Sequence, residues 1–304
     1  MARGRLYIAL AAILWSTSGA FTKVLTKDTV FHLDQPEIET LQIGGLNLQV
    51  QIACYRVLFA GLALSATVRR RDLRFRPAML AMLVVFATMN AVFISAMGGG
   101  SAANAILLQY SAPIWLYLVG VFLLGEPSDR RGTISTFVGV FGITVIVAGG
   151  WGREDMTVIA LGLASGVTYA GVLLYLRVLR DVPANWLTVW NHLLGGLLLL
   201  PLVLTLRAPT WPQFGTLICF AIFQMGLAYW LMAKGLQTVG ASEAGTISLL
   251  EPILNPLWAY LVSPGTEVPS LWTFVGGAII LGALAWRYWP GRAEPRKGPG
   301  DDTA

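Results

Sequence analysis

The chain has 304 residues, of which 56% are apolar and 12% are charged. About a quarter of the residues of an ordinary soluble domain are charged, so the composition excludes such a domain and indicates a protein that lies in lipid. The net charge of +5 does not indicate a nucleic-acid partner, because the basic residues cluster in short connections between apolar stretches.

Ten apolar stretches follow one another along the chain, and each is long enough for a helix to cross a hydrocarbon core of about 30 Å. They are residues 6 to 26, 49 to 68, 77 to 97, 102 to 124, 132 to 150, 157 to 176, 184 to 206, 214 to 233, 241 to 262 and 271 to 289. The sequence therefore predicts an all-α membrane protein with ten transmembrane helices. Residues 291 to 304 are rich in Pro, Gly and charge, which predicts a disordered cytoplasmic tail.

The basic residues are distributed unequally between the two sides of this arrangement. Sixteen of the 21 Lys and Arg residues lie in the two ends of the chain and in the even-numbered connections, whereas the odd-numbered connections hold three. Cytoplasmic segments of membrane proteins carry the excess of Lys and Arg. We therefore expect an integral protein of the cell (inner) membrane with both termini in the cytoplasm.

The chain contains an internal repeat. The letters TFVG occur at 136 to 139 and again at 273 to 276, and SAANAILLQYSAPIW aligns with GASEAGTISLLEPIL, which places Pro113 opposite Pro252. The two repeats, residues 1 to 150 and 156 to 290, each hold five predicted spans. Because five is odd, the second repeat must cross the membrane in the opposite direction, and inverted repeats are a recurring transporter architecture.

Several stretches in this order resemble the drug/metabolite transporter superfamily, EamA type. They are LWSTSGA in the first span, Arg56 in the second, SAPIWLYLVGVFLLGE in the fourth and LLEPILNPLWAYLV in the ninth, and the match covers residues 5 to 290. The resemblance implies a secondary carrier, usually an exporter of amino acids or other small metabolites, without a cofactor. The connection from Lys27 to Leu48 is longer than is usual there, and we interpret it as a floppy or peripherally packed insertion, with an external lid as the alternative. SPGTEVPS replaces the Gly-Glu motif of the first half, which leaves the role of Glu267 open.

Glu251 is the clearest candidate for chemistry. A charged side chain at mid-bilayer costs about 2.5 to 3.5 kcal/mol, so it usually faces a cavity or a partner. We interpret Glu251 either as a proton-coupling or substrate-amine site, or as a helix-packing carboxyl beside Pro252.

The prolines and the second embedded charge have two interpretations each. Pro113, Pro252 and Pro256 are predicted helix kinks that free the carbonyls of Gln109, Ser248 and Pro252 to line a cavity, although prolines are also ordinary in membrane helices. Arg56 is predicted to be a structural charge that pairs with Glu251 or with backbone carbonyls. The alternative is that Arg56 binds an anionic group such as a substrate carboxylate.

Polar and aromatic side chains within the spans complete the predicted substrate-binding site. Its members are Trp15, Ser16, Thr17, Asn90, Gln109, Tyr110, Tyr169, Asn191, Gln224, Tyr229 and Glu251. Together they would form a cavity with aromatic walls, which suits an amphipathic zwitterion or a planar cation. The alternative for the aromatic residues is an interfacial anchor, and for the amides it is a bond between helices. His192 is predicted to be a packing residue, and the alternative is a proton relay.

These observations predict a secondary transporter that exports small amphipathic metabolites, such as amino acids, by alternating access, with Glu251 as the proton-coupling candidate. The alternatives are an exporter of organic cations or drugs, and a channel or sensor. The sequence holds no HExxH pair, no Ser with a nearby Lys or His, and no paired intramembrane aspartates, so we predict no enzyme activity, no metal and no cofactor. The expected partners are a small-molecule substrate and membrane lipid, and the expected state is a monomer or homodimer.

Overall fold

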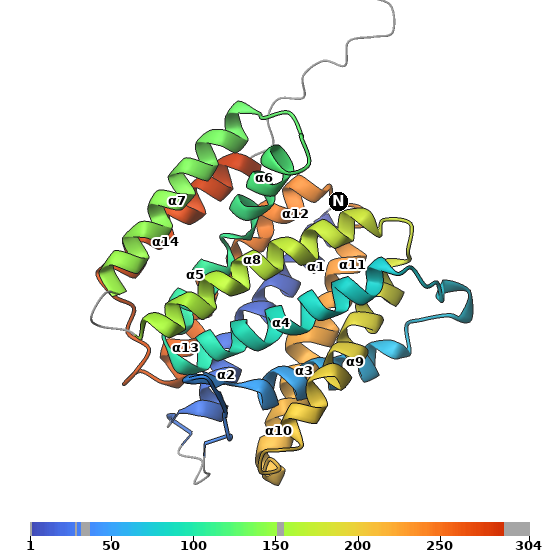
Figure 1. The fold of residues 1–304 in the computed structure, drawn as a ribbon, viewed down its shortest axis with the longest axis vertical. Coiled ribbons are helices and arrows are strands. Elements are labelled where there is room, and N and C mark those ends of the chain that lie inside the picture. The colour runs from blue at the N-terminus through green and yellow to red at the C-terminus, as the bar shows by residue number, and fades with distance from the viewer. Residues whose placement is uncertain (1, 28, 32–36, 151–154, 289–304) are drawn as a thin grey trace, which may run out of the picture.

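A computed structural model describes residues 2 to 27, 29 to 31, 37 to 150 and 155 to 288 (Figure 1). The first repeat contains helices α1 (Ala2–Ser16), α2 (Ser18–Thr26), α3 (Val50–Ser65), α4 (Ala78–Gly99), α5 (Ala102–Gln109), α6 (Ala112–Phe122) and α7 (Arg130–Gly150). The second contains α8 (Met156–Val178), α9 (Ala184–Val203), α10 (Trp211–Cys219), α11 (Ala228–Gly235), α12 (Ala241–Ser248), α13 (Leu250–Val262) and α14 (Leu271–Tyr288). A π-helical segment, Phe220–Leu227, joins α10 to α11, and Arg70–Asp72 form a 3-10 turn. The predicted tail, residues 291 to 304, lies outside the described residues.

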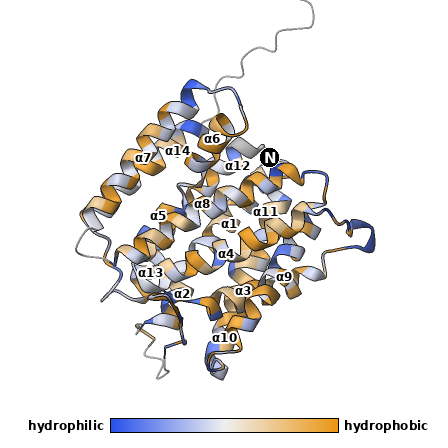
Figure 2. Cartoon of the chain, in the orientation of Figure 1, coloured by the Kyte–Doolittle hydropathy of each residue, from blue (hydrophilic) through white to orange (hydrophobic). Residues whose placement is uncertain are grey.

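The helical composition agrees with the all-α membrane protein that the sequence predicts. Eight helical segments of the described residues are long and apolar enough to cross a membrane, and α3 is a shorter apolar helix. The helices are largely apolar along their lengths, and the hydrophilic residues gather at their ends and in the connections (Figure 2). The remaining predicted span, residues 241 to 262, consists of two short helices, α12 and α13, with a break at Leu249. The count of ten spans and their inverted arrangement stay predictions.

Three of the predicted spans are interrupted near their middles. The first breaks at Thr17, the fourth at Tyr110 and Ser111, and the ninth at Leu249. The last two breaks lie just before Pro113 and Pro252. A proline interrupts a helix at this place because it lacks the backbone N–H and its ring collides with the carbonyl four residues earlier. Each of these two breaks leaves backbone groups to be satisfied by other parts of the protein.

The helices pack mainly between the two repeats rather than within them. Helix α3 packs on α9, α7 on α14, α4 on α8, α1 on α11 and α5 on α13, and the first three pairs lie side by side in Figure 1. One large apolar core runs through both repeats, and a second one lies between α3, α4, α8 and α9. The two repeats therefore form one interleaved bundle.

The long connection after α2 folds onto the bundle. Strands β1 (Leu41–Ile43) and β2 (Leu46–Leu48) form an antiparallel hairpin whose turn, Gly44 and Gly45, has positive φ angles of 56° and 82°, as a two-residue turn of this kind requires. The Ile38 side chain is 3% exposed, and its N–H donates to the carbonyl of Leu25. The described part of this connection is thus packed on the helical bundle.

The close approach of α7 to α14 gives a stability prediction. A Cβ atom added at Gly276 would lie 2.7 Å from the carbonyl oxygen of Gly142 and 2.6 Å from Ile146, whereas one added at Gly282 would meet nothing within 4 Å. We expect Gly276→Ala to lower the free energy of unfolding by about 1 to 3 kcal/mol, because the helices must separate. Thermal unfolding in detergent measures this, and Gly282→Ala on the same helix is the control that should unfold no earlier than the unsubstituted protein.

Candidate functional site

The helix ends meet at two faces of the bundle. We call the Lys23 face the one formed by the connections after α2, α4, α9 and α13, which hydrogen bonds tie together; the N–H of Val30, for example, donates to Val262. We call the Arg177 face the opposite one, formed by the connections after α3, α6, α8 and α11. The candidate site lies between these faces.

Tyr110 and Glu251 join the interrupted spans of the two repeats. The Tyr110 hydroxyl lies 2.8 Å from Oε2 of Glu251 and 3.1 Å from the carbonyl oxygen of Ser248. This carbonyl is the one that Pro252 leaves without its helical partner. One hydroxyl therefore lies where it can satisfy either a freed carbonyl or a carboxyl, and both acceptors belong to the other repeat.

Aromatic rings from four helices follow one another beside this contact. The Trp15 and Tyr229 rings meet edge to face with centroids 5.2 Å apart, and Tyr229 meets the imidazole of His192 at 4.9 Å. His192 also contacts the ring of Phe86 at 4.9 Å. Its Nδ1 lies 2.8 Å from the carbonyl oxygen of Thr188, and its Nε2 is buried without a partner. The structure thus places His192, which the sequence analysis assigned to packing, against one predicted site residue, Tyr229.

Gln224 and Asn191 bring buried amides to the same region. Gln224, in the π-helical segment, donates from Nε2 to the carbonyl oxygen of Trp15 at 3.2 Å, and its Oε1 is buried without a partner. Asn191 donates to the sulfur of Met82 at 3.4 Å, and its Oδ1 is likewise unpartnered. Buried polar atoms are almost always hydrogen-bonded, so these two unpartnered oxygens are exceptions to the usual pattern.

The break in the first span is fixed by α13. The Ser16 hydroxyl accepts from Nε1 of Trp258 at 2.9 Å, and the Ser18 hydroxyl accepts from Nδ2 of Asn255 at 2.8 Å. The Thr17 hydroxyl donates to the carbonyl oxygen of Leu14 at 2.6 Å. Ser16 and Thr17 therefore hold the break together, and the structure shows them in helix packing.

Arg56 contacts an amide and two aromatic rings. Its Nη2 donates to Oδ1 of Asn90 at 2.5 Å, and its guanidinium carbon lies 5.9 Å from the ring centroid of Phe93 and 5.3 Å from that of Phe220. Arg56 and Glu251 interact electrostatically, but they form no ion pair within 4 Å. The interaction with Asn90 replaces the expected pairing with Glu251 or with backbone carbonyls.

Two remaining candidates have fewer contacts. Tyr169, on α8, is half-buried and lies within electrostatic range of Tyr229 and Glu251. Gln109 is buried at the end of α5. Tyr169 thus belongs to the region around Glu251, and Gln109 directly precedes Tyr110 in the chain.

Two of the three predicted kink prolines, Pro252 and Pro256, line an apolar hollow, and Pro113 does not. A cavity of about 550 Å³ lies between α5, α13 and α14, and Pro252 and Pro256 form part of its wall. Ile253 and Leu257 on the same wall are 55% and 47% exposed, so this hollow opens on the outer surface of the bundle. Pro256 lies inside the continuous helix α13.

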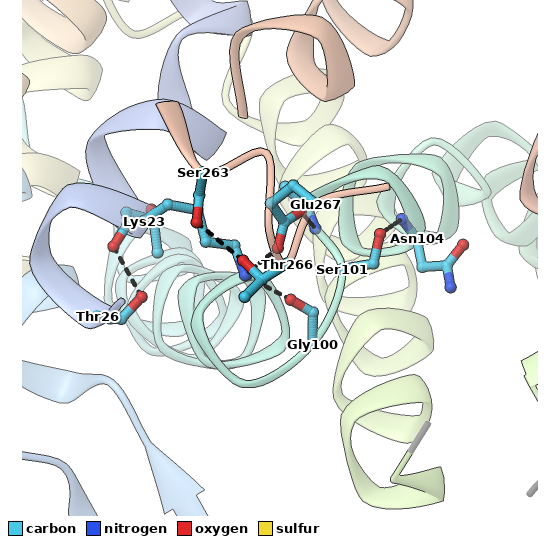
Figure 3. A network of polar contacts seen from close by, with 10 residues as sticks. Lys23, Thr26, Gly100, Ser101, Asn104, Ser263, Thr266 and Glu267 are labelled. Carbon is cyan, nitrogen blue, oxygen red and sulfur yellow. Dashed lines mark hydrogen bonds and ion pairs between the residues drawn. The ribbon is translucent and has the colours of Figure 1, made fainter. Parts of the chain in front are cut away.

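At the Lys23 face a buried ion pair connects three segments. Lys23 Nζ lies 2.6 Å from Oε1 of Glu267, and the two side chains are 0% and 3% exposed. Lys23 also donates to the carbonyl oxygen of Gly100 at 2.6 Å, and Oε2 of Glu267 accepts from the N–H of Ala102 at 2.9 Å. Figure 3 shows that Lys23, Glu267 and Gly100 point toward one another from α2, from the connection after α13 and from the turn between α4 and α5.

The Arg177 face has ion pairs as well, but these are exposed. Arg177 lies 3.4 Å from Glu126, and the two side chains are 53% and 50% exposed. Arg76 pairs with Asp181, whose pKa the Arg76 hydrogen bond lowers. The two faces therefore differ: the charges that join the repeats are buried at one and solvated at the other.

Sequence reasoning left the role of Glu267 open and assigned no role to Lys23. The sequence shows a lysine near the end of the first span and an acid after the ninth, but it does not indicate that the two residues contact each other. No group of three His, Cys, Asp or Glu side chains that could hold a metal ion occurs in the described part of the chain.

Comparison with known proteins gives consistent matches. The profile of the EamA-like transporter family matches residues 45–148 and again 156–288. An uncharacterized transporter of Archaeoglobus fulgidus is 26% identical over 94% of this chain and 97% of its own length. The uncharacterized transporter YwfM of Bacillus subtilis is 25% identical over 96% of this chain and 94% of its own. A solved crystal structure shares the fold with a TM-score of 0.61 and 18% identity, over 94% of this chain and 97% of the other.

The buried ion pair predicts unequal mutational costs at the two faces. Lys23→Met leaves the Glu267 charge buried and unpaired, so we expect it to lower the free energy of unfolding by about 3 to 5 kcal/mol. Arg177→Met at the exposed pair should cost less than about 1 kcal/mol. Thermal unfolding in detergent measures both changes.

The double variant Lys23→Met with Glu267→Gln separates charge from packing. It removes both charges and keeps an oxygen for the Ala102 N–H, so it should recover most of the stability that Lys23→Met loses. Equal losses for the double and the single variant would contradict the assignment of the cost to an unpaired charge.

Proposed function

Because the chain belongs to the EamA-like transporter family, we propose that it is a secondary transporter that exports small amphipathic metabolites, amino acids or related compounds, by alternating access. The family and the relatives make the chain a membrane transporter and not an enzyme. The observation that carries the proposal is the contact between Tyr110 and Glu251 at the breaks of two spans. Discontinuous helices that meet near the midplane form the substrate and ion sites of many transporters.

The packing pattern supports an inverted repeat. If the spans are numbered one to ten, the packed pairs α3–α9, α7–α14 and α5–α13 are spans two with seven, five with ten and four with nine. Exchanging each span with the one five places away leaves these pairs unchanged. The same exchange turns the pair α4–α8, spans three and six, into α1–α11, spans eight and one. A two-fold axis in the membrane plane has this effect.

The basic residues support an orientation. The clusters at 69–76 and 130–131 lie in connections of the Arg177 face, whereas the Lys23 face holds few Lys and Arg residues. By the positive-inside rule the Arg177 face is cytoplasmic, with both termini. The Lys23 face is then external, which makes the buried ion pair an external closure.

The ion pairs at the two faces are equivalent under the same exchange. Lys23 ends the first span and meets Glu267 after the ninth, while Arg177 ends the sixth span and meets Glu126 after the fourth. One pair is buried and the other is half exposed. This asymmetry supports a conformation that is closed toward the outside. In the other conformation of the proposed cycle, the pair of Lys23 with Glu267 is exposed to water and the pair of Arg177 with Glu126 is buried.

A second candidate function is the export of organic cations. The carboxyl of Glu251 and the aromatic rings of Trp15 and Tyr229 favour it, because a cation gains both from a carboxylate and from aromatic faces. Such a transporter would share the mechanism and differ in the cargo.

Counterflow in proteoliposomes tests the transport proposal. Vesicles loaded with one unlabelled compound should accumulate its labelled form only when they contain the protein, with amino acids and organic cations as the two test sets. We expect the substitution Glu251→Gln to remove the response of transport to an imposed pH gradient, since an amide cannot carry a proton.

The control is Tyr110→Phe, which removes the hydroxyl and keeps the carboxyl, so a pH response should remain. Absence of counterflow for both test sets would count against a carrier. An unchanged pH response in Glu251→Gln would remove this residue from coupling while leaving the transport function in place.

Alternating access predicts that the Lys23 face must open. In a protein without its natural cysteines, the pair Lys23→Cys and Glu267→Cys is joined by a short reducible bifunctional thiol reagent. Counterflow should stop after joining and return after reduction, because the external closure can no longer separate.

Joining Arg76→Cys to Asp181→Cys is the matched control. These positions lie beside α4 and α8, which pack on each other along their lengths, so transport should continue. Undiminished counterflow in the joined Lys23 and Glu267 variant would overturn the assignment of this face as a gate.

A further inference from the structure

Arg56 carries a buried charge that forms no ion pair with an acid of the described residues. The residue is 3% exposed on α3, and its single side-chain partner is the neutral amide of Asn90. Two of its three nitrogens, Nε and Nη1, are buried without any hydrogen-bond acceptor. A guanidinium has five N–H donors in a planar fork, so most of its donors are unused.

The contacts that Arg56 does make cannot replace an anion. The Phe93 and Phe220 rings offer an attraction to the cation, but they accept no conventional hydrogen bond from the fork. A buried charge is expensive unless it is both paired and hydrogen-bonded. A chain that only needed to tie helices together here would gain more from neutral side chains.

We propose that Arg56 binds the carboxylate of the transported solute through the donors that the protein leaves free. Two parallel N–H groups of a guanidinium match the two oxygens of a carboxylate. This inference rests on the proposed transport function and names its cargo more narrowly. It adopts the alternative interpretation of Arg56, that of a group that binds an anion, in place of a structural charge.

The groups around Arg56 define the rest of the solute. Glu251 and Tyr229 both interact electrostatically with Arg56, and Glu251 is engaged by Tyr110 rather than by the arginine. A solute with a carboxylate at Arg56 and an ammonium at Glu251 would balance both charges. The rings of Trp15 and Tyr229 then meet its apolar part. These features describe an amino-acid-like zwitterion and disfavour a simple cation, which Arg56 would repel.

Matched ligands test this assignment on the purified full-length protein. The probes are free amino acids and their amides, which keep the ammonium and lack the carboxylate, and binding is measured by thermal shift over a concentration series. In the unsubstituted protein we expect at least one amino acid to bind about 10-fold or more tightly than its amide. In Arg56→Gln the amino acid should bind no more tightly than the amide, while affinity for the amide stays unchanged or rises.

Arg56→Lys keeps the charge and removes the fork, so it should recover only part of the preference for the acid. Gly282→Ala, which alters an open position on α14, should retain the full preference. Equal preference for the acid in Arg56→Gln and in the unsubstituted protein would overturn the inference, and so would binding of amides or cations alone. Counterflow of organic cations in the latter case would leave the proposed transport function standing.

Protein stability separates the anion site from a helix tie. If Arg56 held the helices together, Arg56→Gln without ligand would unfold at a clearly lower temperature. An anion-binding arginine instead destabilises the empty protein, so we expect the empty variant to unfold at the same or a higher temperature. A marked fall in that temperature together with unchanged selectivity would assign Arg56 to structure.

Discussion

A backbone carbonyl that loses its helical partner inside an apolar bundle must find another donor, and this demand determines how the two repeats meet. Pro252 frees the carbonyl of Ser248, and the hydroxyl of Tyr110 reaches it from the other repeat. The same hydroxyl contacts the carboxyl of Glu251. The break in the ninth span, the break in the fourth and the embedded acid are therefore one structural unit.

Buried charged side chains also need partners, and the two buried cations, Lys23 and Arg56, differ in the partners that they have. Lys23 is satisfied by Glu267 and by the carbonyl of Gly100, so its burial is complete without a ligand. Arg56 has an amide and two rings, and its remaining donors are unused. One embedded cation is thus fully paired, and the other is the proposed anion site. The difference lies in their partners, since both side chains are buried.

The apolar runs, the prolines and the embedded acid could be predicted because each is a local property of the chain. Glu251, Pro252 and Tyr110 are recognisable as polar or helix-breaking residues within apolar stretches of the sequence. The pairing of Lys23 with Glu267 could not be predicted, because it depends on how α2, α5 and α13 converge in space, and the motif around Glu267 departs from its counterpart. The π-helical segment around Gln224 and the break at Thr17 have no proline signal, and single glycines such as Gly226 and Gly19 do not locate them; contacts with the Trp15 carbonyl and with Trp258 accompany them in the structure.

A buried ion pair is well suited to a closure that must also open. Its Coulomb attraction is largely offset by the water that both charges lose on burial, so the net free energy of a buried pair is small even though breaking it by removing one partner is costly. When the Lys23 face separates in the proposed cycle, Lys23 and Glu267 are both rehydrated together, and neither is left buried alone. An apolar seal of similar area would instead expose its whole surface to water on opening. The ion pair between Arg177 and Glu126, which the proposed inverted repeat places on the opposite face, is exposed to water in the structure. In the proposed cycle, movement between the two conformations would transfer one desolvated ion pair from one face to the other, so we expect the two states to differ little in electrostatic free energy.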